Sequence, residues 1–211
     1  MDSRLYNSLR GEFVWYPKRG VGYLPQITKT AYDKAYYDEY KRRGKTELGE
    51  KINTLRATLV DKYLLEDEWV LDIGCGACDF IKKRGHAYGY DICANSQAWL
   101  LDNNLFMDPY SDEMLDVKAL TFFDSFEHIP DVSVILSRFQ GEFIVMSIPI
   151  FNGLSHIFNS KHYKPEHIYY FTEYGLQEFL GHMGYDLLQS SWAESALGRE
   201  DIGTFVFARK A

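Results

Sequence analysis

The sequence predicts an α/β fold with a mostly parallel sheet, an antiparallel edge strand and helices on both faces of the sheet. From residue 69 onward, short apolar runs alternate with helical segments, which is the order that builds a parallel sheet. Near the end, two strand-like runs, 185–191 and 203–209, are joined by a polar loop, as expected for an antiparallel pair. The 211 residues are enough for one large domain with its own core.

Residues 1–45 are predicted to form an N-terminal arm and a helical cap. Residues 1–29 are rich in Gly, Pro and aromatic residues, which favours an irregular arm or lid over a disordered linker. A short helix is expected over 30–43. A longer helix is expected over 46–63, because apolar residues recur three and four positions apart and share one face: Leu48, Ile52, Leu55, Leu59 and Tyr63.

Residues 46–211 are predicted to form the main domain, with a seven-stranded sheet. Strands are expected at 69–73, 87–92, 105–107, 119–123, 142–148, 185–191 and 203–209. Helices are expected at 79–84, 95–102, 131–139 and 172–183, the last of them capped by Thr172. The third strand is the weakest of these predictions, because the interval between Asp91 and Asp124 is short. Residues 150–170 are expected to form a lid-like insertion.

Charge and composition narrow the class of protein. The net charge of −7 disfavours a dedicated nucleic-acid-binding protein. Residues 1–62 hold 13 Lys or Arg and 8 Asp or Glu, whereas the remainder holds 10 and 22. Such a basic segment suits a phosphorylated, nucleotide or sugar-nucleotide substrate, or it is a solvated helix end. The chain lacks a long apolar run and a secretory signal and has three cysteines, which predicts a cytoplasmic protein without a membrane span.

The most informative segment is 69–78, WVLDIGCGAC, with Asp91 at the end of the next strand. An acid and two close glycines after a strand suit a nucleoside-containing cofactor, because glycine lets the backbone approach the ligand and the second acid can bind ribose hydroxyls. A nicotinamide dinucleotide would require Gly-x-Gly-x-x-Gly, but Ala77, Cys78 and Asp79 follow Gly76. The pattern therefore disfavours a dehydrogenase.

Three later segments follow in a consistent order: 123–131 (FDSFEHIPD), 142–149 (EFIVMSIP) and 167–172 (HIYYFT). Together with the glycine segment, this series resembles the class I, Rossmann-like methyltransferases that use S-adenosylmethionine, and within them the ubiquinone-type and other small-molecule enzymes. The resemblance covers residues 50–209. It implies the seven-stranded sheet of that class. Cys78 departs from the pattern, because a third glycine often stands there.

The resemblance implies S-adenosyl-L-methionine as cofactor. Asp72, Gly74 and Gly76 would hold its amino-acid end and ribose, and Asp91 would bind the 2′- and 3′-hydroxyls. Three residues that follow strand ends are expected to complete the site: Ile92, Asp124 and Ser125. In the ubiquinone-type enzymes an arginine before the first strand binds the cofactor's carboxylate, so Arg56 is either that residue or an arginine on the helix surface.

Methyl transfer is an in-line displacement, so the protein aligns the reactants, excludes water and removes a proton from the acceptor. His128, after the fourth strand, is the first candidate for the general base, followed by His167 and His162. It stays open that none of them is the base. No metal site is expected, because Cys75 and Cys78 lie inside the cofactor loop and suit small buried residues better than a zinc or redox site.

We therefore expect a methyltransferase for a small-molecule acceptor, with oxygen as the first choice of acceptor atom and nitrogen or carbon next. Two alternatives stay open: a methyltransferase fold that only binds its cofactor or a partner, and another group transfer from the same cofactor. Nucleic acid is disfavoured, because 124–127 (DSFE) lacks the motif of the DNA amino-methylating enzymes. The aromatic pairs Tyr36-Tyr37 and 169–171 either line a pocket for a planar substrate or pack a cap. The sequence does not predict the oligomeric state.

Overall fold

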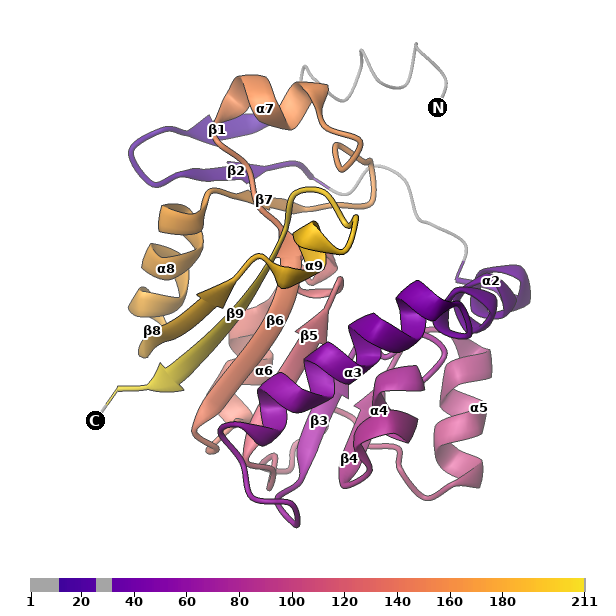
Figure 1. The fold of residues 1–211 in the computed structure, drawn as a ribbon. Coiled ribbons are helices and arrows are strands. Elements are labelled where there is room, and N and C mark those ends of the chain that lie inside the picture. The colour runs from indigo at the N-terminus through magenta and orange to yellow at the C-terminus, as the bar shows by residue number, and fades with distance from the viewer. Residues whose placement is uncertain (1–11, 26–31, 211) are drawn as a thin grey trace.

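The computed structural model of the chain describes residues 12–25 and 32–210. Within these residues the main sheet has six strands in the order β4-β3-β5-β6-β9-β8 (Figure 1). They are β3 (Val70–Ile73), β4 (Ala87–Tyr90), β5 (Ala119–Phe123), β6 (Phe143–Pro149), β8 (Tyr185–Ser191) and β9 (Ile202–Arg209). Strands β4, β3, β5 and β6 are parallel, and β9 is antiparallel to both of its neighbours, β6 and β8. The mostly parallel sheet with an antiparallel pair at one edge is thus confirmed.

The predicted third strand is reduced to a single bridge between Gly89 and Phe106. The Gly89 N–H donates to the Leu105 carbonyl (2.8 Å), and the Met107 N–H donates to the Gly89 carbonyl (3.1 Å). The structure therefore does not confirm the prediction of seven strands. Between α5 (Ala94–Asp102) and β5, residues 103–118 form turns and isolated bridges instead of a strand.

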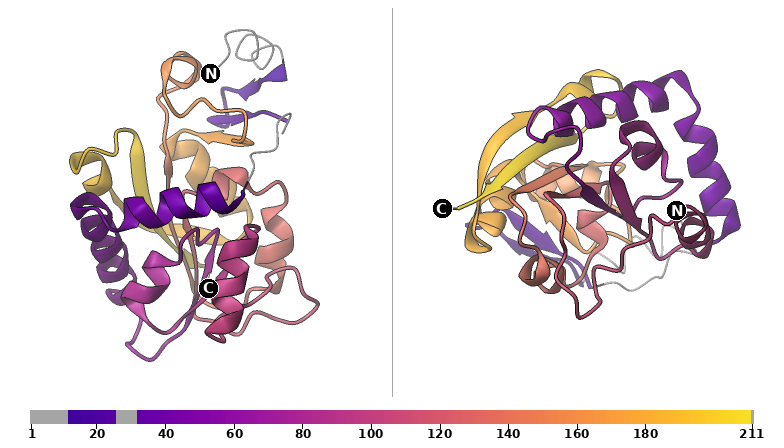
Figure 2. Two further views of the ribbon diagram at one scale, coloured as in Figure 1. Left: turned by 90° about the vertical axis from the view of Figure 1, so that its right-hand side faces the viewer. Right: turned by 90° about the horizontal axis from the view of Figure 1, so that it is seen from below.

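Helices cover both faces of the main sheet, as predicted (Figure 2). α3 (Glu47–Asp61), α4 (Asp79–Arg84) and α5 pack on one face, and α6 (Val132–Arg138) and α8 (Glu173–His182) pack on the other. Side chains alternate between the two cores: Ala119 and Phe123 of β5 belong to one, and Leu120 and Phe122 belong to the other. Because both faces are buried, the strands are continuously apolar in sequence.

The N-terminal hairpin is a feature that the sequence analysis missed. β1 (Val14–Tyr16) and β2 (Val21–Tyr23) pair with β7 (Tyr169–Phe171) in a second, three-stranded antiparallel sheet (Figure 1). The prediction of an irregular arm over 1–29 is therefore wrong for residues 14–23, whereas 1–11 and 26–31 lie outside the described residues. Three-residue strands are too short to show the alternating pattern from which strands are predicted.

The helix expected over 30–43 is α2 (Lys34–Gly44), which begins after the N-cap residue Asp33. α2 lies beside α3 and α5. The hairpin, in contrast, lies next to α7 (Leu154–Asn159), within the insertion predicted at 150–170 (Figure 1). A single helical cap formed by residues 1–45 is therefore not confirmed. In the described part of the chain, no helix is both long and apolar enough to cross a membrane.

The turn of the hairpin is held by the first residues of α8. The Gly20 carbonyl accepts hydrogen bonds from the Thr172 N–H (2.8 Å) and the Thr172 Oγ1 (3.1 Å). The Thr172 Oγ1 also accepts from the Gly175 N–H (2.9 Å), which confirms Thr172 as the N-cap of α8. A Cβ on Gly175 would lie 2.1 Å from the Gly20 oxygen. Only glycine therefore fits at position 175.

Gly175→Ala is expected to destabilise the protein by about 1–3 kcal/mol, because the added methyl overpacks this contact. Gly181→Ala in the same helix is the matched control, since its Cβ would meet only the Lys210 Nζ at 3.9 Å. The control variant is expected to be more stable than the parent by about 0.5–1 kcal/mol. Denaturant unfolding measures both effects, and two variants of equal stability would contradict the anchoring role of the turn.

Candidate functional site

A cavity of about 420 Å³ opens at the carboxyl ends of β3, β5 and β6, where ligands bind in open α/β sheets. Its wall includes the loop after β3, the segment after β5, side chains of α2 and α3, and part of the insertion. The structure brings eight predicted site residues to this wall: Arg56, Asp72, Gly74, Gly76, Asp124, His128, His162 and His167. Asp91, Ile92 and Ser125 are not among the described lining residues.

The loop after β3 has the backbone conformation that its glycines allow. Gly74 and Gly76 have φ angles of 80° and 54°. A Cβ on Gly74 would lie 2.4 Å from the Cβ of Ser125, so Ser125 packs directly against the loop, and its Oγ donates to the Ile73 carbonyl. Cys78, at the position of the missing third glycine, is also left-handed, with φ of 62°. For a residue with a Cβ this conformation costs roughly 1–2 kcal/mol.

Asp91 holds the glycine loop from the end of β4. Its two carboxylate oxygens accept hydrogen bonds from the Gly76 N–H (2.7 Å) and the Cys93 N–H (2.8 Å). Burial raises the pKa of Asp91, although these N–H groups favour the ionised form. Its neighbour Ile92 is 61% exposed, and its side chain makes no part of the described cavity wall.

Asp72, at the end of β3, is buried behind the same loop. Its carboxylate accepts a hydrogen bond from the Thr121 Oγ1 of the neighbouring strand (2.7 Å). Burial raises the pKa of Asp72 to about 7, although the hydrogen bond and the charge of Arg56 favour ionisation. Asp72 therefore changes its charge near neutral pH, and a cationic group in the cavity would hold it ionised.

A cluster of four charges lies at one side of the cavity; Arg56 and Glu194 are buried, whereas the side chains of Asp124 and Arg199 are 26% and 24% exposed. Arg56 donates to Glu194 through Nε (2.8 Å) and Nη2 (3.0 Å), and to Asp124 through Nη2 (2.9 Å). Arg199 donates to Asp124 (2.8 Å) and also to Glu194. Glu194 is fully buried and accepts a further hydrogen bond from the Ser147 Oγ (2.7 Å). The cluster has two positive and two negative groups, so its charges balance.

The cluster shows whether Arg56 lies on the surface of its helix, a question that the sequence left open. Arg56 is 8% exposed and its guanidinium lies over the Phe123 ring at 4.6 Å, so the alternative of an arginine on the helix surface is wrong. Burial alone would raise the pKa of Asp124, but the guanidiniums of Arg199 and Arg56 hold it below its usual range. Asp124 is therefore ionised at neutral pH.

The side chains of Glu127, His128 and His167 also line the cavity. The His128 Nδ1 lies 2.9 Å from the Glu166 carbonyl, which can only accept, so Nδ1 carries the proton and Nε2 is free to accept one. The His128 Nε2 lies 4.0 Å from the Glu127 Oε1. The His128 and His167 rings are perpendicular, with centroids 4.6 Å apart. One ligand-type atom from each residue lies within 4.8 Å of the other two.

Burial sets the charge of this triad, Glu127, His128 and His167. Burial raises the pKa of Glu127 to about 8, with a smaller contribution from Asp124. Burial also lowers the pKa of His128, and lowers that of His167 well below its usual range. Among the described residues, the Glu127 Oε2 and the His167 Nδ1 have no hydrogen-bond partner. At neutral pH the triad is therefore uncharged and has unused hydrogen-bonding capacity.

His162, Cys75 and Cys78 have interactions of their own outside this triad. The His162 Nε2 lies 3.0 Å from the Glu200 carbonyl, and burial lowers the pKa of His162. Cys75 and Cys78 are free, with their sulfurs 3.6 Å apart. The hydrogen bond with Cys78, and then burial, raise the pKa of Cys75, so its thiol is protonated. Neither observation suggests a reactive thiolate.

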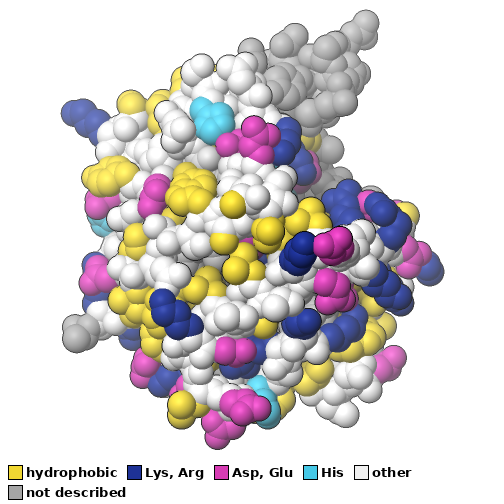
Figure 3. Space-filling view, viewed as in Figure 1, with side chains coloured by type: hydrophobic (Ala, Val, Ile, Leu, Met, Phe, Trp, Pro, Cys, Tyr) yellow, Lys and Arg dark blue, Asp and Glu magenta, His cyan; other side chains and the backbone are white. Residues whose placement is uncertain are grey.

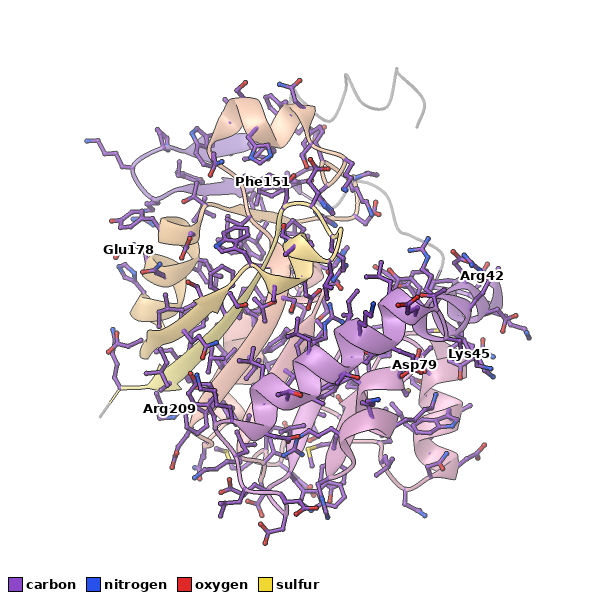
Figure 4. All side chains as sticks on the ribbon, in the orientation of Figure 1. Arg42, Lys45, Asp79, Phe151, Glu178 and Arg209 are labelled. Carbon is purple, nitrogen blue, oxygen red and sulfur yellow. The ribbon has the colours of Figure 1, made fainter. Side chains whose placement is uncertain are left out.

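The basic N-terminal segment lies on the surface beside the cavity. Lys and Arg side chains gather around α2, and Figure 3 shows several of them on that side of the molecule. Arg42 and Arg43 both pair with Glu39 of the same helix, at 2.8 and 2.7 Å. Figure 4 shows Arg42 at the surface, with Lys45 and Asp79 where α2 approaches α4. The segment is thus largely a solvated helix end. Tyr36 lines the cavity, but Tyr37 and residues 169–171 pack in the interior.

Sequence reasoning missed Glu127, Glu194 and Arg199. Glu127 is part of the recognised segment 123–131, but nothing in the pattern indicates that its carboxyl is buried without a cation beside it. Glu194 lies within the short helix α9 (Ala193–Ala196) and Arg199 in the turn before β9, a region whose sequence is that of a polar loop. No motif marks them, because their role depends on Arg56 and Asp124, which are distant in sequence.

Neither a protein-family model nor a curated protein matches the sequence. Among solved structures, magnesium protoporphyrin IX methyltransferase from Synechocystis PCC 6803, with bound SAH (S-adenosylhomocysteine), matches 85% of this chain and 96% of its own at a TM-score of 0.57 and 15% identity. The chain has the class I methyltransferase fold.

Two other structures show how varied the neighbours of this methyltransferase fold are. The first is the 1,6-didemethyltoxoflavin-N1-methyltransferase from Burkholderia thailandensis, with a TM-score of 0.57, 14% identity, and 93% and 99% of the two chains covered. The second, the [4+2]-cyclase SpnF, has a TM-score of 0.56, 12% identity, and 80% and 84% covered. At such identities the likeness establishes the fold, and the site has to carry the argument for function.

Glu194→Ala is expected to destabilise the protein by about 3–5 kcal/mol, because the buried guanidinium of Arg56 and the partly exposed one of Arg199 would then share one carboxylate. Glu178→Ala is the control, since Glu178 is an exposed acid on α8 (Figure 4) and its loss should change stability by less than about 0.5 kcal/mol. Urea unfolding monitored by circular dichroism gives both values. Similar values for the two variants would show that the cluster does not stabilise the fold.

Glu127→Gln is expected to stabilise the protein at neutral pH. A carboxyl whose pKa is raised from 4.5 to about 8 keeps its proton in the folded protein and releases it on unfolding, so stability falls as pH rises between these values. At pH 7 the raised pKa lowers the free energy of unfolding by at most about 3 kcal/mol, and an amide of the same shape, which does not titrate, removes this loss. Unfolding at pH 5 and pH 7 tests this: the gain should be larger at pH 7, and a pH-independent difference would refute the raised pKa.

Proposed function

We propose that this protein is an S-adenosylmethionine-dependent methyltransferase that acts on a small-molecule acceptor. The observation that carries the proposal is the glycine loop at the carboxyl end of β3. Gly74 and Gly76, both with positive φ, bring bare backbone to the cavity wall, with a buried acid on either side in Asp72 and Asp91. This arrangement suits a nucleoside cofactor with no pyrophosphate, because the third glycine of the dinucleotide fingerprint is absent.

The residues present fit this cofactor. Asp72, Gly74 and Gly76 would hold its amino-acid end and ribose, and Arg56 would face its carboxylate from within the charge cluster. Asp91, Ile92, Asp124 and Ser125 would complete the site, with Ser125 and Asp91 acting mainly by holding the loop. When bound, S-adenosylmethionine supplies an electrophilic methyl group on a sulfonium, and the chain supplies position and a place for the acceptor's proton.

His128 is the best placed of the three candidate bases. Its Nδ1–H is held by the Glu166 carbonyl, which fixes the ring and leaves the Nε2 lone pair facing Glu127 in the cavity. Its lowered pKa keeps the ring neutral, as a base must be before it accepts a proton. His167 shares the same space, whereas the contact between His162 and Glu200 leaves His162 less free. We place the reaction in the cytoplasm, where the three free cysteines would stay reduced.

A second candidate function is non-methylating chemistry or plain ligand binding in the same fold. The likeness to a [4+2]-cyclase and the left-handed Cys78 in the glycine loop favour it. The two functions differ in what happens to the cofactor, since only methyl or other group transfer would consume S-adenosylmethionine.

Calorimetry with S-adenosylmethionine and S-adenosylhomocysteine tests the proposed function. Both are expected to bind. Asp91→Ala is expected to weaken binding by roughly 10- to 100-fold, because the glycine loop loses the charged acceptor of the Gly76 N–H that holds it in place. Asp102→Ala, an exposed acid on the neighbouring α5, should bind as the parent does. Thermal unfolding of each variant shows whether it is folded. Binding of neither compound to the folded parent protein would refute the proposal.

A further inference from the structure

The triad Glu127, His128 and His167 is the part of the cavity with the most unused bonding capacity. Glu127 and His167 are 3% and 4% exposed, and each has a buried polar atom without a hydrogen-bond partner in the described chain. The His128 Nε2 has a lone pair on the same side, because its Nδ1 donates to the Glu166 carbonyl. Buried polar atoms of this kind are costly unless a ligand satisfies them.

One ligand-type atom from each of the three residues can reach a common ligand atom. Three points no more than 4.8 Å apart always lie within about 2.8 Å of a shared point, which is the donor–acceptor distance of a short N–H hydrogen bond. A carboxylate oxygen and two imidazole nitrogens are all acceptors when the imidazoles are neutral in the appropriate tautomer. A primary ammonium group has three N–H donors and so matches all three.

Building on the proposed function, we propose that Glu127, His128 and His167 bind the amino group of a primary amine carried on an aromatic body, and that its nitrogen is the methylated atom. We infer the aromatic body of this amine from Tyr36 and Tyr40, which line the same cavity with ring centroids 4.4 Å apart. Aromatic rings prefer to pack against one another in such walls.

The surrounding charges are compatible with a cation at this point. The positive charge of Arg199 is balanced by Asp124 and Glu194. Lys164 also lines the cavity and its positive charge acts on all three groups of the triad, but its side chain is exposed, so solvent screens that charge. Asp124 adds a negative charge near Glu127. An ammonium ion would also bring Glu127 to its ionised form, because a nearby positive charge favours the carboxylate.

Two other ligands fit the triad less well. A hydroxyl acceptor could donate to one imidazole and accept from the protonated Glu127, but it would leave the other imidazole unsatisfied and bring no charge to pair with the carboxylate. A tetrahedral zinc ion with bonds near 2.1 Å holds its ligand atoms about 3.4 Å apart. The nearest carboxylate oxygen of Glu127 lies 4.0 Å from the His128 Nε2, which is wider than zinc needs and suits the longer bonds of an ammonium group.

In the reaction, the bound ammonium first gives a proton to the Glu127 carboxylate or to the His128 Nε2. The lone pair freed on nitrogen then forms the new nitrogen–carbon bond, while the carbon–sulfur bond breaks and its electron pair stays on sulfur. The products are an N-methylammonium and a neutral thioether, so charge and atoms balance. No oxidant or further reactant is needed.

The experiment compares primary amines with alcohols of the same shape: benzylamine with benzyl alcohol, phenethylamine with 2-phenylethanol, and tyramine with tyrosol. Binding is measured by calorimetry on chelator-treated protein in the presence of S-adenosylhomocysteine. At least one amine is expected to bind ten or more times more tightly than its alcohol, and to be methylated on nitrogen when S-adenosylmethionine is supplied. Glu127→Gln is expected to lose at least tenfold in amine affinity while keeping its affinity for S-adenosylhomocysteine.

The controls separate this inference from the proposed function. Glu178→Gln makes the same change at an exposed acid and should leave amine binding unaltered. If S-adenosylhomocysteine binds but no amine binds better than its alcohol, the inference is overturned and the proposed function stands. If S-adenosylhomocysteine fails to bind, the proposed function itself fails. Tight binding of Zn²⁺, Mg²⁺ or Mn²⁺ that Glu127→Gln abolishes, with no preference for amines, would assign the triad to a metal ion and overturn the inference.

Discussion

The site depends on the charge cluster of Arg56, Asp124, Glu194 and Arg199. Arg56 comes from α3, Asp124 from the end of β5, and the other two from the connection between β8 and β9, so four charges join three distant parts of the chain. Charges can be buried at this depth only when each has its partners, because an unpaired one costs several kcal/mol. The pairing therefore fixes Asp124, a non-glycine residue with φ of 61°, at the edge of the cavity.

Two kinds of polar group thus meet in one cavity. In the cluster every charge is paired, which makes it rigid and leaves it little capacity for a new ligand. In the triad of Glu127, His128 and His167, burial has removed the charges and left bonding positions unused. Stability and function oppose one another at Glu127, because an unpaired buried carboxyl destabilises the empty protein and is the group that a cation would satisfy. A binding site for a small polar ligand requires both: a rigid wall, here the paired cluster, and polar groups with free hydrogen-bonding positions, here the triad.

Much of the fold could be predicted from the sequence, and the exceptions have physical causes. The strands at 70–73, 119–123 and 143–149 are mostly apolar because both faces are buried, and the helices between them have apolar residues on one face. The three-residue strands of the hairpin have no such pattern, and they form because β7 offers an edge to pair with. The glycine loop was recognisable because its backbone demands particular residues. Glu194 and Arg199 were not, since any polar loop has such residues and only the folded chain brings them to Arg56.

The neighbours of the fold make the same distinction between scaffold and chemistry. They include methyltransferases for different acceptors and a cyclase, so the sheet and its loop do not determine the reaction. In this chain the glycine loop, Asp72 and Asp91 lie at the ends of β3 and β4, whereas the triad lies after β5 and on the insertion. Two of the triad's groups are adjacent in sequence, and the third depends on the hairpin, because residues 169–171 that follow His167 pair with β2. The N-terminal hairpin, together with the hydrogen bond from the Ile168 N–H to the Glu127 carbonyl (2.8 Å), thus helps to position His167, and through it the shape of the space that an acceptor must fit.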